Sequence, residues 1–101
     1  MEIYINDQSE VTTVRLVGRL DTPASLEASQ QLQGVIDNAG KQIVLDCKEL
    51  SYISSSGLRI FLTIRKAASA AGGKVVVRGM NADIRQVFMM TGFLNLFEIE
   101  E

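Results

Sequence analysis

The chain has 101 residues, which is enough for one compact domain and too short for a second domain with its own core. Apolar residues make up 47 % and charged residues 22 %, a balance that excludes a disordered chain, and the net charge of -2 argues against a general nucleic-acid binder. The absence of histidine excludes Ser-His-Asp and Cys-His catalytic sites and imidazole zinc sites. With a single cysteine, no secretory signal pattern and no apolar run of bilayer length, we expect a cytoplasmic protein with neither membrane nor nucleic-acid partners.

The first part of the chain predicts a hairpin followed by a helix. Extended runs at Ile3–Asn6 and Val11–Val17 flank a short polar segment, which indicates two antiparallel strands. Thr22 is expected to cap a helix that has proline in its first position, and apolar residues at helical spacing carry this helix over Pro23–Ala39.

The remainder of the chain alternates strands and helices. Strands are predicted at Gln42–Cys47, Lys74–Arg78 and Leu96–Glu100, and helices from Ser56–Gly57 to Gly72–Gly73 and from the cap Asn81 to Gly92. The order β-β-α-β-α-β-α-β predicts an α/β fold, a single domain over residues 1–101 with a mixed, mostly parallel sheet and packed helices.

The helix that begins near Ser56 is expected to be well buried. Arg59, Thr63 and Lys66 share a narrow polar stripe, whereas apolar side chains cover most of the remaining surface. Arg65 falls inside the apolar arc, so its stem is expected to pack while its guanidinium reaches an edge.

Three adjacent serines, Ser54, Ser55 and Ser56, lie where a parallel strand gives way to this helix. The carboxyl ends of parallel strands collect at one edge of a sheet, so residues 18–22, 51–57 and 79–81 are expected to meet there. Free N–H groups and the dipole at the helix start favour negative charge, which would accommodate a phosphate. The alternative is that the serines serve only as caps and turn residues.

Several segments resemble the STAS domain, a family named for sulphate transporters and anti-sigma factor antagonists. They are residues 43–58 (IVLDCKELSYISSSGL), the turn Gly18-Arg19-Leu20-Asp21, residues 72–74 (GGK) and residues 90–94 (MTGFL). The resemblance covers essentially the whole chain, and the serine segment is its most specific part.

The resemblance implies a phosphorylation-switched regulator of transcription. Such a protein, when unphosphorylated, binds a serine kinase that doubles as an anti-sigma factor; phosphorylation weakens the complex, and a PP2C-type phosphatase restores it. The family's loop of aspartate, serine, serine or threonine, and glycine places the phosphoacceptor at Ser55, with Ser54 and Ser56 as less favoured alternatives. Ser54 stands where the family has aspartate. The resemblance implies no enzyme activity and no cofactor.

Contacts with the partner are expected from the serine segment, the helix that follows it and the neighbouring loops. The expected residues are Asp21, Ser54, Ser56, Gly57, Arg59, Leu62, Thr63 and Met80. Asp21 would place a like charge beside a phosphate, or it would only precede a helix and favour the helix dipole; both roles are compatible.

Two other functions have to be weighed. One is an unphosphorylated STAS scaffold subunit of a transporter ATPase complex, against which the intact serine segment argues. The other is an enzyme with Ser55 or Cys47 as nucleophile, which is disfavoured because neither Lys48 nor Asp46 forms a recognised nucleophile–base pair. Cys47 is instead expected in the core.

The methionines after the last buried strand also have two interpretations. Met80, Met89 and Met90 would form a pliable binding surface or fill gaps in the core, and methionines near a helix more often fill gaps.

Overall fold

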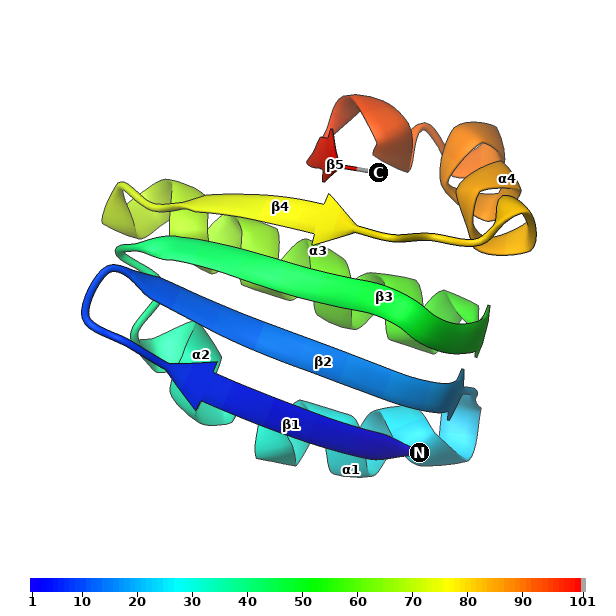
Figure 1. Ribbon diagram of the computed structural model, residues 1–101, viewed down its shortest axis with the longest axis horizontal. Helices are drawn as coiled ribbons and strands as arrows, with labels where there is room; N and C mark the ends of the chain where they lie inside the picture. The colour runs from blue at the N-terminus through cyan, green and yellow to red at the C-terminus, as the bar shows by residue number, and fades with distance from the viewer. Residues whose placement is uncertain (101) are drawn as a thin grey trace.

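The computed structural model describes residues 1–100 and shows one five-stranded sheet with helices (Figure 1). The strands are β1 (Glu2–Asp7), β2 (Val11–Leu20), β3 (Gln42–Ile53), β4 (Lys74–Arg78) and β5 (Glu98–Glu100), in the spatial order β1-β2-β3-β4-β5. β1 pairs antiparallel with β2, and the other neighbours pair parallel. The helices are α1 (Thr22–Gln31), α2 (Gln33–Asp37), α3 (Ser55–Ala71) and α4 (Ala82–Thr91), followed by a 3₁₀ turn, η1 (Phe93–Asn95). The predicted α/β class and mixed sheet are confirmed.

The core lies between the sheet and one layer of helices. Figure 1 shows α1, α2 and α3 behind the sheet, with α4 beside the end of β4. On β3, Ile43, Leu45 and Cys47 are fully buried on the helix side. Where α3 and α4 approach each other, Phe61 of α3 and Phe88 of α4 pack edge to face, with ring centroids 5.8 Å apart. Cys47 is therefore a core residue, as expected.

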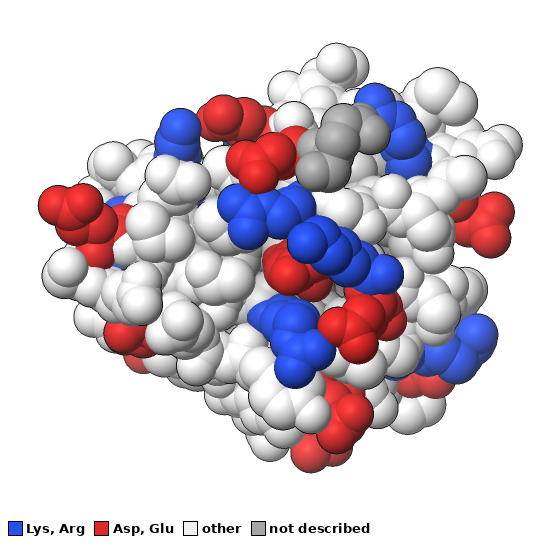
Figure 2. Space-filling model, in the orientation of Figure 1, with Lys and Arg blue, Asp and Glu red and all other residues white. Residues whose placement is uncertain are grey.

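The other face of the sheet carries a row of polar side chains that crosses all five strands. The register places Tyr4, Arg15, Asp46, Arg78 and Glu100 side by side. Arg15 lies 4.3 Å over the Tyr4 ring, and Arg78 pairs with Glu100 at 2.7 Å. Figure 2 shows both signs of charge interleaved over the middle of this face. Because the charges alternate across the strands, they offset one another, and the face stays hydrated without a second helix layer.

The first helical segment differs from its prediction in two ways. The expected helix Pro23–Ala39 is wrong: it is divided at Leu32, which has φ -91° and ψ 1°, into α1 and α2. The cap is Asp21, whose carboxylate accepts from the N–H of Ala24 at 3.0 Å, and not Thr22, which is already in the helix. Asp21 and Thr22 are both competent caps, and the extended backbone at Asp21 decides between them.

The ends of two strands and the positions of two methionines also differ from the predictions. β2 and β3 continue to Leu20 and Ile53, well beyond the predicted ends, so most of residues 51–57 is not a loop. Met89 and Met90 do not fill gaps in the core but are 61 % and 76 % exposed, because α4 buries its opposite face. Met80, by contrast, is partly buried and packs against the core, which is one of the two interpretations that the sequence left open.

Candidate functional site at the start of α3

Three segments meet at the carboxyl ends of β2, β3 and β4. The backbone N–H of Ser54 donates to the carbonyl oxygen of Leu20 at 2.9 Å, which joins the ends of β2 and β3. The Asn81 side chain caps α4 and also donates from Nδ2 to the Leu50 carbonyl at 3.2 Å, which holds the start of α4 against β3. The edge predicted from the strand order is therefore present.

Ser54 is the cap of α3 and is almost fully buried. Its Oγ accepts a hydrogen bond from the N–H of Gly57 at 3.1 Å, and its carbonyl accepts from Leu58 at 2.9 Å. Its exposed fraction is 8 %. Aspartate and serine are both strong caps, so Ser54 can perform the capping role of the aspartate that the STAS pattern has at this position.

Ser55 and Ser56 are the first two residues of α3. Ser55 is exposed and Ser56 is partly buried, and neither hydroxyl makes a hydrogen bond to residues 1–100. Both lie in the first turn, where helix N–H groups lack intrahelical acceptors and the helix dipole favours an anion. Of the three adjacent serines, Ser55 is thus the one that is exposed and has an unengaged hydroxyl.

Gly57 allows the start of α3 to approach the sheet closely. A Cβ at this position would lie 2.8 Å from Cγ of Leu20 and 2.9 Å from Cγ1 of Ile53, both of which are buried. Close packing against β2 and β3 therefore explains why a residue without a side chain follows the serines. Its N–H is also the donor to the Ser54 cap.

Asp21 is engaged in the structure of α1. Its side chain accepts from Ala24, and its carbonyl accepts from both the N–H and the Oγ of Ser25, at 2.9 and 2.7 Å. Asp21 follows Leu20, which bonds to Ser54, so its acidic side chain belongs to the segment adjoining the serines. The structural role of Asp21 is thus observed; an effect on a phosphate is left to the proposal below.

Beyond the serines, α3 presents the predicted polar stripe of Arg59, Thr63 and Lys66, all of which are exposed. Ser55, Arg59 and Thr63 are exposed at intervals of four residues, and Thr63 donates from Oγ1 to the Arg59 carbonyl at 2.9 Å. Arg59 makes no ion pair within residues 1–100. Leu62 is partly buried at the border of this stripe.

A groove of about 310 Å³ runs between α1 and α3 beside this stripe. Arg59 is its one charged lining residue among those described, and the groove also contains Leu26, which is 72 % exposed. Its lining residues are Thr22, Ser25, Leu26, Ser29, Ser56, Arg59, Ile60 and Thr63. Leu26 was not identified from the sequence. The pattern that could have identified it is a large apolar residue outside the buried face of its helix.

Two further exposed residues at this edge also escaped the sequence analysis. The Arg19 guanidinium lies 4.4 Å over the ring of Tyr52, and the two residues are register partners near the ends of β2 and β3. The register shifts between Gly18 and Arg19, so counting residues along the two strands would not have paired them. Met80 lies just after β4 on the same edge and packs against the core.

The thiol of Cys47 is fully buried in the core. Burial, with a smaller contribution from Asp46, raises the pKa of the thiol to about 12, so the residue is neutral at physiological pH. Residues 1–100 contain no cluster of acidic and cysteine side chains able to hold a metal, and none of the helices described there is long and apolar enough to cross a bilayer.

Comparison with known proteins places this geometry in a family. The model of the STAS domain matches residues 2–101. The chain belongs to the STAS domain family. BtrV of Bordetella bronchiseptica, assigned as an anti-sigma factor antagonist, is 31 % identical over 84 residues, covering 83 % of this chain and 72 % of BtrV. The anti-sigma F factor antagonist of Paenibacillus polymyxa is 29 % identical over 100 residues, 98 % of this chain and 86 % of the relative.

Solved structures confirm the STAS fold. SpoIIAA of Bacillus, an anti-sigma factor antagonist, has been solved unphosphorylated and phosphorylated; both forms superpose with a TM-score of 0.75 at 20 % and 21 % identity. The matches cover 99 % and 97 % of this STAS chain, and 87 % and 90 % of the SpoIIAA chains. Homology to the curated relatives supports anti-sigma factor antagonist function, in a family whose antagonists bind anti-sigma factors and are generally not enzymes.

Proposed function

We infer that this STAS protein is a cytoplasmic partner switch whose working group is the Ser55 hydroxyl. Unphosphorylated, it binds an anti-sigma factor that is also a serine kinase; phosphorylated on Ser55, it releases that partner. A PP2C-type phosphatase restores the binding form. The chain itself is a substrate and carries no catalytic machinery.

The observation that carries this proposal is the different engagement of the three serines. The Ser54 hydroxyl accepts from Gly57 and is buried, so a kinase would have to unwind the α3 cap to reach it. Ser55 is exposed and makes no such bond. Ser56 is partly buried and lines the α1–α3 groove, which makes it a less accessible alternative.

A phosphate on Ser55 would change the charge of the surface more than its shape. Phosphoserine adds roughly -1.5 to -2 charges with three strong acceptor oxygens. The N–H groups at the start of α3 that the Ser54 cap leaves unbonded, and the Arg59 guanidinium four residues along the helix, are expected to hold it. The fold is therefore expected to persist, as in SpoIIAA, which has been solved in a phosphorylated form.

Release of the partner then has two physical causes. The phosphate repels acidic groups of the partner, and Asp21 at the adjoining segment adds a like charge. The phosphate also engages Arg59, the one cation of the α1–α3 groove among the described residues, which the unphosphorylated protein offers to the partner. Leu62, Thr63 and Met80 are expected to complete the contact surface. Gly57, which the sequence analysis also placed there, is buried beneath the start of α3 and packs against the sheet instead.

Affinity purification followed by binding measurements tests the proposal. The wild-type chain should retain an anti-sigma factor with kinase activity from native cells. Ser55→Asp should lose at least tenfold in affinity for that purified partner, while Ser55→Ala should bind it and resist release by ATP. Recovery of a transporter ATPase alone, or release of the Ser55→Ala protein by ATP, would contradict the proposal and favour the scaffold interpretation.

A further inference from the structure

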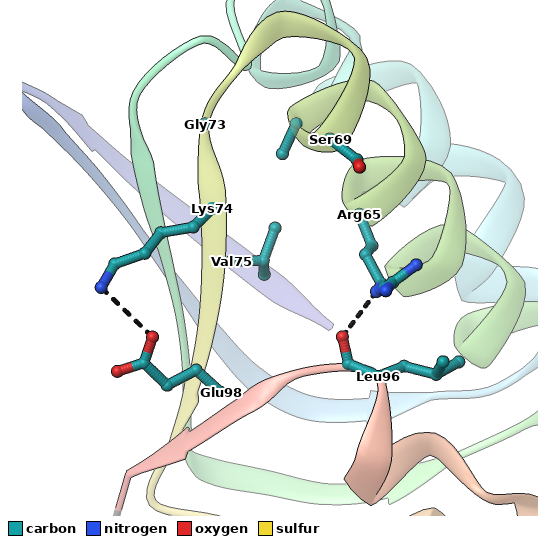
Figure 3. A pocket seen from close by; sticks show the side chains of 8 residues that line it. Arg65, Ser69, Gly73, Lys74, Val75, Leu96 and Glu98 are labelled. Carbon is teal, nitrogen blue, oxygen red and sulfur yellow. Dashed lines mark hydrogen bonds and ion pairs between the residues drawn. The ribbon is translucent and has the colours of Figure 1, made fainter.

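A pocket on the side of the molecule away from the serines gathers hydrogen-bond donors. It lies between α3 and the outer edge of β4, with a volume of about 210 Å³ (Figure 3). Arg65 and Ser69, one turn apart on α3, line it together with Val75 of β4 and Leu96, which precedes β5. The Ser69 hydroxyl makes no hydrogen bond to residues 1–100.

Arg65 brings a positive charge to this pocket and also bonds to Leu96, which lines it. Its Nε donates to the carbonyl oxygen of Leu96 at 2.5 Å, which leaves the two terminal nitrogens of the guanidinium without a partner among residues 1–100. The expectation that the head of Arg65 reaches an edge is met, because Leu96 directly precedes the 97–100 segment that ends in the edge strand β5.

The backbone of Val75 adds a third donor. Lys74 donates to Lys41 on the β3 side, and Gly79 donates to Glu100 on the β5 side, so the strand alternation directs the Val75 N–H outward toward β5. The β4–β5 pairing begins only at Val76 and Glu98. The next acceptor in the parallel ladder would be the Leu96 carbonyl, which instead accepts from Arg65. Within residues 1–100 the Val75 N–H therefore faces the pocket without a backbone acceptor.

Two further residues that line the pocket, Glu98 and Lys74, carry opposite charges. Glu98 pairs with Lys74 at 3.2 Å. Figure 3 shows both side chains turned away from Arg65, on the other side of Val75. Arg65 makes no ion pair within residues 1–100, and the carboxylate of Glu98 is already paired with Lys74.

We propose that this pocket binds an oxyanion, a phosphate or carboxylate group, through the Arg65 guanidinium, the Ser69 hydroxyl and the Val75 N–H. The three donors are of the types that recognise such groups, and a guanidinium matches the paired oxygens of either anion. The site is separate from Ser55 and does not depend on the proposed switch.

Amide chemical shifts in the intact protein test the proposal. Inorganic phosphate and acetate are titrated separately, each against sodium chloride at equal ionic strength. At least one anion should shift the Val75 amide resonance saturably, and the responding anion identifies the ligand class. Ser69→Ala, which removes only a hydroxyl, should weaken binding about tenfold, and Arg65→Gln should abolish it.

Lys66→Gln is the matched control, because it removes a positive charge from the neighbouring exposed position, outside the pocket lining. It should leave the titration unchanged. The proposal is overturned if neither anion shifts Val75 saturably, if Ser69→Ala has no effect, or if Lys66→Gln weakens binding as much as Ser69→Ala.

Discussion

The carbonyl oxygen of Leu20 accepts a hydrogen bond from the N–H of Ser54 at 2.9 Å, and this bond ties β2 to the residue that caps α3. Since Asp21 follows Leu20 and Ser55 follows Ser54, the same bond joins the two segments that carry these residues. The proposed switch thus lies at a hydrogen-bonded junction between β2 and α3, and we expect a phosphate there to alter binding without a change of fold.

The Ser54 cap should be measurable as stability. Ser54→Ala removes the acceptor for the Gly57 N–H, and we expect the free energy of unfolding to fall by about 0.5–2 kcal/mol in urea denaturation. Ser54→Asp, which retains a capping oxygen, should lie near the wild type. Ser55→Ala should change stability little; a loss there as large as for Ser54→Ala would contradict the assignment of the cap.

Gly57 should tolerate alanine poorly, although alanine is the better helix former. The added Cβ would meet Leu20 and Ile53 at 2.8–2.9 Å, so we expect a net loss of about 1–2 kcal/mol in unfolding free energy. Gly34→Ala is the matched control, because it also lies in a helix and a Cβ there has no neighbour within 4 Å. That variant should be neutral or more stable. Equal effects of the two substitutions would disprove the packing argument.

Burial of Cys47 should make stability depend on alkaline pH. The pKa of its thiol is raised from 9.0 to about 12, so as the pH rises the unfolded chain loses this proton before the folded protein does. The contribution of the buried thiol to the free energy of unfolding is fully present below pH 9. It declines by about 1.4 kcal/mol per pH unit between pH 9 and 12. Lysines and tyrosines also titrate there, so Cys47→Ala is the reference. The wild type should show the steeper decline, and parallel curves would refute the claim.

The α1–α3 groove should contribute directly to partner affinity. Leu26 and Arg59 are exposed groove residues, so Leu26→Ala and Arg59→Ala should each weaken binding of the purified anti-sigma factor about tenfold without unfolding the protein. Lys66→Ala, on the same helix but outside the groove, should bind normally. Calorimetric titration distinguishes these outcomes; wild-type affinity in both groove variants would remove the groove from the interface.

Much of the fold followed from local patterns in the sequence. The alternation of strands and helices, the Asn81 cap and the helix ends at Gly72 and Gly92 were readable because each depends on neighbours in the chain. The break at Leu32 was not, because apolar spacing continues across it and the bend is set by packing.

The candidate site was also predictable only in part. The serine segment and the polar stripe of α3 were expected from motif and periodicity. The Arg19–Tyr52 contact depends on a register shift, and the exposure of Leu26 and Met90 depends on which helix face meets the sheet. Those relationships arise between elements, which a single sequence does not specify.

Site-resolved mass spectrometry of the phosphorylated protein tests the central claim most directly. The native-sequence chain is incubated with its co-purified kinase and ATP, and the modified residue is located by fragmentation. The account predicts one phosphate, on Ser55, absent from Ser55→Ala and removed by a PP2C-type phosphatase. A phosphate on Ser54 or Ser56 in its place, or an unmodified chain bound to an active kinase, would contradict it.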